Sequence, residues 1–147
     1  MTRHVRWWIL TAIAAASALG CGVHQRSPSE PAVQPDSIVI DSISPPAGTT
    51  LAPGSTVVFG AILHYAAHEN LGGGVAAQME DASGNLLVTR FPATAVPQGA
   101  GMVTLASQFQ IPSSGLSRID IYYILYATPG VTTEIVASTK ASYPVGR

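Results

Sequence analysis

Cysteine is almost absent from this chain: Cys21 is the only one in 147 residues. Tryptophan is confined to Trp7 and Trp8, and charged residues make up only 10% of the sequence. A single cysteine excludes a disulfide within the chain. Any packed domain downstream must therefore be held together by aliphatic packing.

Basic stripes and catalytic motifs are also missing. The chain has seven Lys and Arg residues against eight Asp and Glu, with no clustering of positive charge, which excludes nucleic acid as an expected partner. No Gly-x-Ser-x-Gly motif occurs. His64 and His68 are the only histidines beyond residue 35, and their order and spacing relative to Ser and Asp do not define a catalytic triad. We expect a non-enzymatic protein that needs no cofactor.

The first twenty residues have the pattern of a secretion signal. Arg3 and Arg6 precede an apolar run over residues 7–19, and small residues lead to Cys21. This run, of about 13 residues, fits the apolar region of a signal peptide and is short for a membrane span. Residues 1–20 are therefore predicted to be a cleaved signal.

The segment Ala18-Leu19-Gly20-Cys21 resembles the lipobox of bacterial lipoproteins. The resemblance implies cleavage before Cys21 and lipidation of its sulfur, with the membrane as partner through acyl chains that each add about 0.8 kcal/mol per buried CH₂. Gly22 stands where an inner-membrane retention signal carries Asp, which favours the outer membrane, facing either side. The alternative is an ordinary cleaved signal that leaves an unpaired cysteine.

Residues 21–35 are rich in proline, serine and glutamine and have almost nothing to bury. They are predicted to form a flexible tether. Removing the signal would leave five basic and eight acidic residues, a net charge of about −3, in roughly 127 residues, enough for one domain.

Residues 36–147 are predicted to form that domain. Clusters of Pro, Gly, Ser and Asn separate about seven short runs rich in β-formers. Within the runs, apolar residues recur every second position, as in strands that bury one face. Four rows are expected to face the core: Val57, Phe59, Ala61, Leu63 and Tyr65; Val75, Ala77 and Met79; Val103, Leu105, Phe109 and Ile111, interrupted by Ser107; and Ile119, Ile121, Tyr123 and Leu125. The pattern predicts an all-β antiparallel sandwich of about seven strands.

The segment Ile40–Thr49, followed by Pro53-Gly54-Ser55-Thr56-Val57, resembles the opening of bacterial immunoglobulin-like domains. Asp81–Asn85 resembles a hairpin turn of these domains, and Tyr143-Pro144-Val145 resembles their last strand. The resemblance implies an immunoglobulin-like sandwich without the Cys–Trp–Cys arrangement of antibody domains. It carries over no catalytic residue, because these domains serve as spacers, adhesion modules and envelope accessories.

His64 and His68 are weak candidates for a metal site, with Glu69 adjacent. In an extended strand, their Cα atoms would lie about 13 Å apart, too far for simple chelation unless a turn begins near Ala67. The alternative is two histidines on a solvated strand end.

Two loops are expected to be structural. Asp81, Ser83 and Asn85 alternate oxygen-bearing side chains but lack the further acidic ligands of a calcium loop, so a turn is expected. The three glycines at 72–74 are followed by no Lys-Ser/Thr pair and are expected to form a flexible connection between strands.

Tyr122, Tyr126 and Arg118 form the candidate binding face. They alternate with the predicted core row of the same strand, so all three would point outward. Exposed tyrosines beside an arginine suit contact with a protein or a glycan. The alternative is that the tyrosines pack beneath a neighbouring loop or strand.

We therefore expect a lipid-anchored envelope protein that acts as a small binding or adhesion module. The alternative is a structural accessory subunit of an outer-membrane or periplasmic complex. A metal-binding module built on His64 and His68 is the weaker third hypothesis. The sequence leaves the ligand and the oligomeric state open.

Overall fold

A computed structural model describes residues 34–88 and 93–146, with the side chains of residues 69–71 and 131–132 excepted. This part of the chain contains six strands. It contains no helix that is long and apolar enough to span a membrane. The strands are β1 (Ser37–Ser44), β2 (Thr56–Asp81), β3 (Leu86–Val88), β4 (Thr94–Gln110), β5 (Arg118–Thr128) and β6 (Val131–Pro144).

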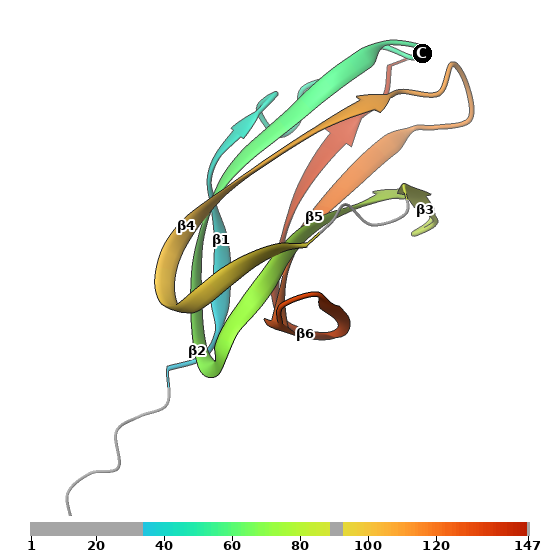
Figure 1. Ribbon diagram of the computed structural model, residues 1–147. Coiled ribbons are helices and arrows are strands. Elements are labelled where there is room, and N and C mark those ends of the chain that lie inside the picture. Colours follow the sequence, from blue (N-terminus) through green and yellow to red (C-terminus); the bar gives the residue numbers. More distant parts are fainter. Residues whose placement is uncertain (1–33, 89–92, 147) are drawn as a thin grey trace, which may run out of the picture. The chain divides into compact units, whose positions relative to one another are not determined.

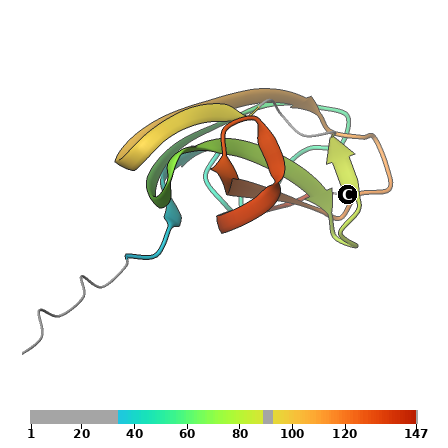
Figure 2. The same cartoon turned by 60° about the horizontal axis from the view of Figure 1, so that its bottom comes forward.

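The strands form two facing layers because β2, 26 residues long, bends and serves in both (Figures 1 and 2). Its first half pairs with β1 on one side and with β4 on the other. Its second half pairs with β5, which pairs with β6, and on its other side with β3 and the start of β4. All of these pairings are antiparallel.

This strand order confirms the predicted antiparallel sandwich with immunoglobulin-like topology. In such folds one layer contains strands A, B and E, and the other contains C, F and G. Here β1, the first half of β2 and β4 occupy the places of A, B and E. The second half of β2, β5 and β6 occupy the places of C, F and G. The six strands agree with the predicted number of about seven, since β2 runs through both layers.

The bend in β2 lies at residues 68–71, which stand opposite Gln98 alone. The backbone N–H of His68 donates a hydrogen bond to the Asp36 carboxylate, and the Gln98 side-chain amide donates to the His68 carbonyl at 3.1 Å. Two hydrogen bonds to one residue thereby fix the corner.

Glycines 72–74 follow this corner, and the expectation of a flexible connection is wrong. All three are buried and lie within β2. A Cβ on Gly72 would come within 2.6 Å of the Val96 carbonyl oxygen, and one on Gly73 within 2.7 Å of the Tyr126 carbonyl oxygen. Gly72 also has a φ of +138°, in the region that favours glycine. The glycines let three strands approach closely.

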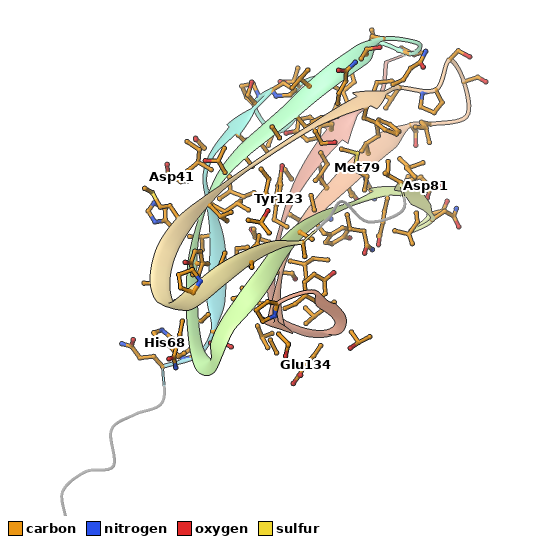
Figure 3. The ribbon with its side chains drawn as sticks, viewed as in Figure 1. Asp41, His68, Met79, Asp81, Tyr123 and Glu134 are labelled. Carbon is orange, nitrogen blue, oxygen red and sulfur yellow. The ribbon has the colours of Figure 1, made fainter. Side chains whose placement is uncertain are left out.

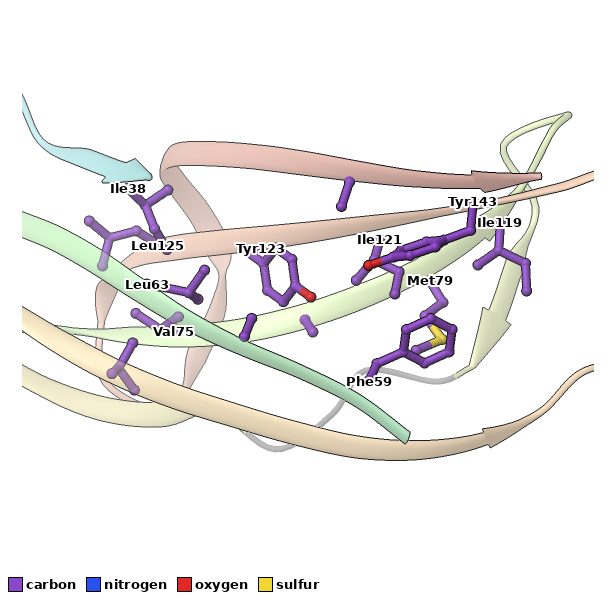
Figure 4. Packing of buried hydrophobic residues seen from close by; sticks show 14 of the residues in the cluster. Ile38, Phe59, Leu63, Val75, Met79, Ile119, Ile121, Tyr123, Leu125 and Tyr143 are labelled. Atoms are coloured by element: carbon purple, nitrogen blue, oxygen red, sulfur yellow. The ribbon is translucent and has the colours of Figure 1, made fainter. Parts of the chain in front are cut away.

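The predicted inward rows do face the space between the layers (Figure 4). Phe59 and Tyr143 pack edge to face with ring centroids 5.2 Å apart, an arrangement that aromatic pairs favour. The Tyr143 hydroxyl donates a hydrogen bond to the Pro45 carbonyl at 2.8 Å, and burial raises the pKa of Tyr143 to about 12. Aliphatic and aromatic contacts hold the two layers together.

The turn prediction for Asp81–Asn85 is confirmed. One oxygen of the Asp81 carboxylate accepts hydrogen bonds from the backbone N–H groups of Ser83 (2.7 Å) and Asn85 (2.9 Å), and the other accepts from the Asn85 side chain at 2.8 Å. These bonds, led by that of the Asn85 side chain, lower the pKa of Asp81. Gly84 supplies the positive φ that the turn needs.

Candidate functional site

Cys21, the predicted lipidation site, lies outside the described residues, as do the predicted signal and nearly all of the predicted tether. The anchor therefore stays a prediction. The first strand that the structure describes, β1, begins at Ser37.

Among the described side chains, which do not include that of Glu69, no group of three His, Cys, Asp or Glu residues converges around His64 or His68. His64 points outward from β2 and lies 3.5 Å from the Asp41 carboxylate, with both side chains half exposed. His68 lies at the corner, where its backbone groups are hydrogen-bonded. The two histidines thus have separate surroundings.

The predicted face of Tyr122, Tyr126 and Arg118 is only partly available. Tyr126 is 1% exposed, and it packs with Ala76 and Ile124 in a small second cluster on the outer side of the layer. Tyr126 is therefore not part of an exposed binding face and follows the alternative, in which a tyrosine packs beneath a neighbouring segment, here with Ala93, just before β4, packed against the cluster. Tyr122 is half buried, and Arg118 is exposed.

Asp120 dominates the electrostatics of this outer face. It is 3% exposed, although it points away from the core. The Ser142 hydroxyl donates to it at 2.6 Å, the Arg118 guanidinium lies at 3.0 Å, and the Lys140 ammonium lies at 3.6 Å. Burial alone would raise the pKa of Asp120, but the hydrogen bond from Ser142 and the two cations outweigh burial and lower it.

Lys140 also lies 5.6 Å from the centre of the Tyr122 ring, within range of a cation–π contact. The two cations of this face, Arg118 and Lys140, are therefore already paired with Asp120. Such a network stabilises the layer and leaves Tyr122 as the aromatic side chain at its margin.

The edge formed by β4 is different in kind. From Gln98 to Gln110, this strand contains no charged residue and no proline. Among the described residues, these positions pair with β2 alone, so the other side of β4 has no strand beside it. An edge strand exposes a row of N–H and C=O groups that can pair with another chain.

The other long edges of the sandwich carry protective features. The segment containing Gly48 and Leu51 covers the end of β6 with backbone hydrogen bonds of 2.8–2.9 Å. The rest of β6 carries Glu134 and Lys140 and shifts register twice against β5. β1 is only eight residues long and shifts register around Asp41. Charges, bulges and short length are the usual means of blocking strand addition.

The core beneath β4 is also less closed than the rest. Leu105 and Phe109 face inward but are only half buried, whereas the inward residues of β5 are fully buried. A cavity of about 280 Å³ opens between the layers at this point. Its lining comes from both layers: Phe59, Ala77, Met79, Thr94, Thr104, Leu105, Ala106, Ser107, Ile121 and Tyr123. Figure 3 shows Met79 and Tyr123, which belong to this lining, between the strands.

The cavity lies next to Ser107, whose side chain is short. This serine is the one small polar residue in the inward row of β4, and it stands opposite Phe59 of β2. A side chain this short leaves the gap between Phe59, Met79 and Tyr123 unfilled. Burial next to this gap raises the pKa of the Tyr123 phenol, so its hydroxyl stays a neutral hydrogen-bonding group.

Sequence reasoning noted the interruption at Ser107 but missed the β4 edge. The signal was available as the absence of charge over residues 98–110. Asp120 was missed because its burial depends on Lys140 and Ser142, which the pairing of β5 with β6 brings beside it.

Comparisons with known proteins give little beyond this geometry. No family model matches the sequence, and no curated protein matches it. A solved structure described as a beta-glucuronidase from glycoside hydrolase family 2 is similar to 76% of this chain at 10% identity, with a TM-score of 0.46. The chain spans about 11% of that enzyme's length. A likeness this distant carries no argument about function.

Proposed function

We propose that this chain is a non-enzymatic binding module, held on the bacterial outer membrane by lipid on Cys21, that captures a protein partner along β4. The supporting observation is the β4 edge, which is uncharged from Gln98 to Gln110 and paired on one side only among the described residues. Addition of an extended peptide to such an edge is a recurrent mode of peptide recognition.

A protein fits this edge better than a glycan does. Backbone N–H and C=O groups on β4 match those of another extended chain, and no charge must be desolvated when the strand is added. The outer face of β5 around Tyr122 is the alternative place for contact, but its cations, Arg118 and Lys140, are already paired with Asp120.

The anchor is tested by protease treatment of intact cells together with a Cys21→Ser variant. We expect the wild-type protein to fractionate with membranes and the variant to be released. Unchanged membrane association of the variant would refute the lipid anchor. Cleavage of the wild-type domain on intact cells would place it on the surface, where adhesion is the role. Protection until the outer membrane is broken would favour an accessory role in the periplasm.

The binding edge is tested with a labelled peptide of about eleven residues in which threonine and serine alternate, with leucine at the centre. A variant with Thr104→Lys and Ala106→Lys places two charges on the exposed side of β4. We expect the double variant to bind the peptide at least about tenfold more weakly, because two ammonium groups would be partly desolvated. The matched control is Ser138→Lys on β6, which should bind as the wild type does.

Equal binding by the β4 double variant and the wild type would exclude β4 as the edge. Thermal unfolding of each variant shows whether weaker binding comes from loss of the fold. Absence of any peptide binding to the folded wild-type protein would refute strand addition altogether.

A further inference from the structure

We infer that the cavity beneath Ser107 is a specificity pocket, which takes one large apolar side chain from the strand that adds to β4. This inference rests on the proposed function and adds to it the chemistry of the partner: an extended segment with a leucine-, isoleucine- or phenylalanine-sized residue at one inward position.

The size of the cavity is sufficient for one large side chain. At about 280 Å³ it lies just below the range of about 300–1,000 Å³ that is usual for small-molecule sites. It is lined by Phe59 on the side of the first layer and by Met79 and Tyr123 on the side of the second (Figure 4). Its remaining side is β4 itself, between Leu105 and Ser107.

The geometry of a sheet fixes where the partner's side chain enters. On an added strand, every second side chain points toward the layer that faces it. The residue beside Ser107 would therefore extend between the layers, next to the gap that Ser107 leaves opposite Phe59. Its neighbours on the strand would point to solvent and can be polar, so specificity comes from one position.

The lining also limits the chemistry of that residue. The polar part of the lining consists of the hydroxyls of Thr94, Ser107 and Tyr123 and of polar groups along β4, and the remaining side chains are apolar. No charged residue lines the cavity among the described side chains. A charged side chain would lose its hydration without gaining a partner of opposite charge, whereas an apolar side chain would be removed from water.

The test compares three peptides that differ only at their centre: the leucine peptide above and versions with serine or lysine in its place. We expect the leucine peptide to bind at least about tenfold more tightly than the serine peptide, as burial of a leucine side chain implies. The lysine peptide should bind no better than the serine peptide.

A Ser107→Leu variant provides the complementary test, because it fills the pocket from within the chain. It should unfold at a higher temperature than the wild type and should bind the leucine and serine peptides equally. A control variant, Ser138→Leu on the exposed side of β6, should retain the preference for leucine.

Equal affinities of the wild type for the leucine and serine peptides would overturn the inference that the cavity is a specificity pocket. If lysines at 104 and 106 still abolished this binding, strand addition would stand without it. A concentration-dependent dimer in sedimentation that is lost in Ser107→Leu would also overturn the inference, since the occupant would then be a second copy of this chain.

Discussion

The β6 edge and the β4 edge of the sandwich differ in how well they are protected against the addition of another strand. On the β6 side, the segment around Gly48 and Leu51 covers the strand end, Tyr143 closes the core, and Lys140 places a charge on the strand. On the β4 side, thirteen residues run without charge or proline, and the inward residues remain half buried. A chain that protects one edge and leaves the other open has a surface suited to strand addition.

The largest expected effect on stability comes from removing a buried side chain on the β6 side. Tyr143→Ala removes a fully buried ring, its contact with Phe59 and its hydrogen bond to Pro45. We expect it to lower the free energy of unfolding by about 4 kcal/mol. Phe109→Ala on the β4 side removes a half-buried ring and should cost about half as much. Chemical denaturation of both variants measures the difference, and equal losses would show that the two sides are closed to the same degree.

The Asp120 network belongs to the β6 side, and its loss should be the next largest effect. Asp120→Asn leaves Arg118 and Lys140 without their shared carboxylate, which we expect to cost about 2 kcal/mol.

The same group predicts a pH dependence. Because the folded-state pKa of Asp120 is lowered, its contribution is fully present above the unfolded-state pKa of about 3.9 and is lost as the pH falls through the folded-state pKa. Unfolding followed from pH 7 to pH 2 should show a smaller loss of stability in Asp120→Asn than in the wild type. Parallel pH profiles for the two proteins would contradict the lowered pKa.

Filling the cavity on the β4 side should have a smaller effect, and it should raise the free energy of unfolding instead of lowering it. Ser107→Leu places apolar atoms in the cavity between Phe59 and Met79 and should raise the free energy of unfolding by about 1 kcal/mol. Destabilisation instead would mean that the cavity cannot accept the side chain without strain.

The smallest effect on stability should come from charging the exposed side of β4. Thr104→Lys changes an exposed residue and should alter the free energy of unfolding by less than about 0.5 kcal/mol. It should nevertheless reduce aggregation on heating, measured by light scattering, because an edge lysine disfavours strand pairing. Ser138→Lys on β6 is the control and should leave aggregation unchanged.

Much of this fold could be predicted from the sequence, because the alternation of apolar residues directly records which side chains face the core. Phe59, Val75 and Ile121 all lie inward as the alternation indicates. The continuity of β2 could not be predicted, since glycines 72–74 resemble a linker until the neighbouring strands show why no Cβ fits. The burial of Tyr126 and Asp120 could not be predicted for a similar reason. Both lie on the outer side of β5 by alternation, and only packing from Ala93 and the register of β6 bury them.

Residue-resolved hydrogen–deuterium exchange of the free protein tests the central claim most directly. An N–H group without a hydrogen-bond partner at an edge exchanges quickly, whereas one in a paired strand is protected. The account predicts that every second amide of β4 between residues 99 and 110 exchanges rapidly, while the amides of Leu51, Val145 and Gly146 at the covered edge exchange slowly. Uniform protection along β4 would show that this edge is already covered, and it would contradict the account.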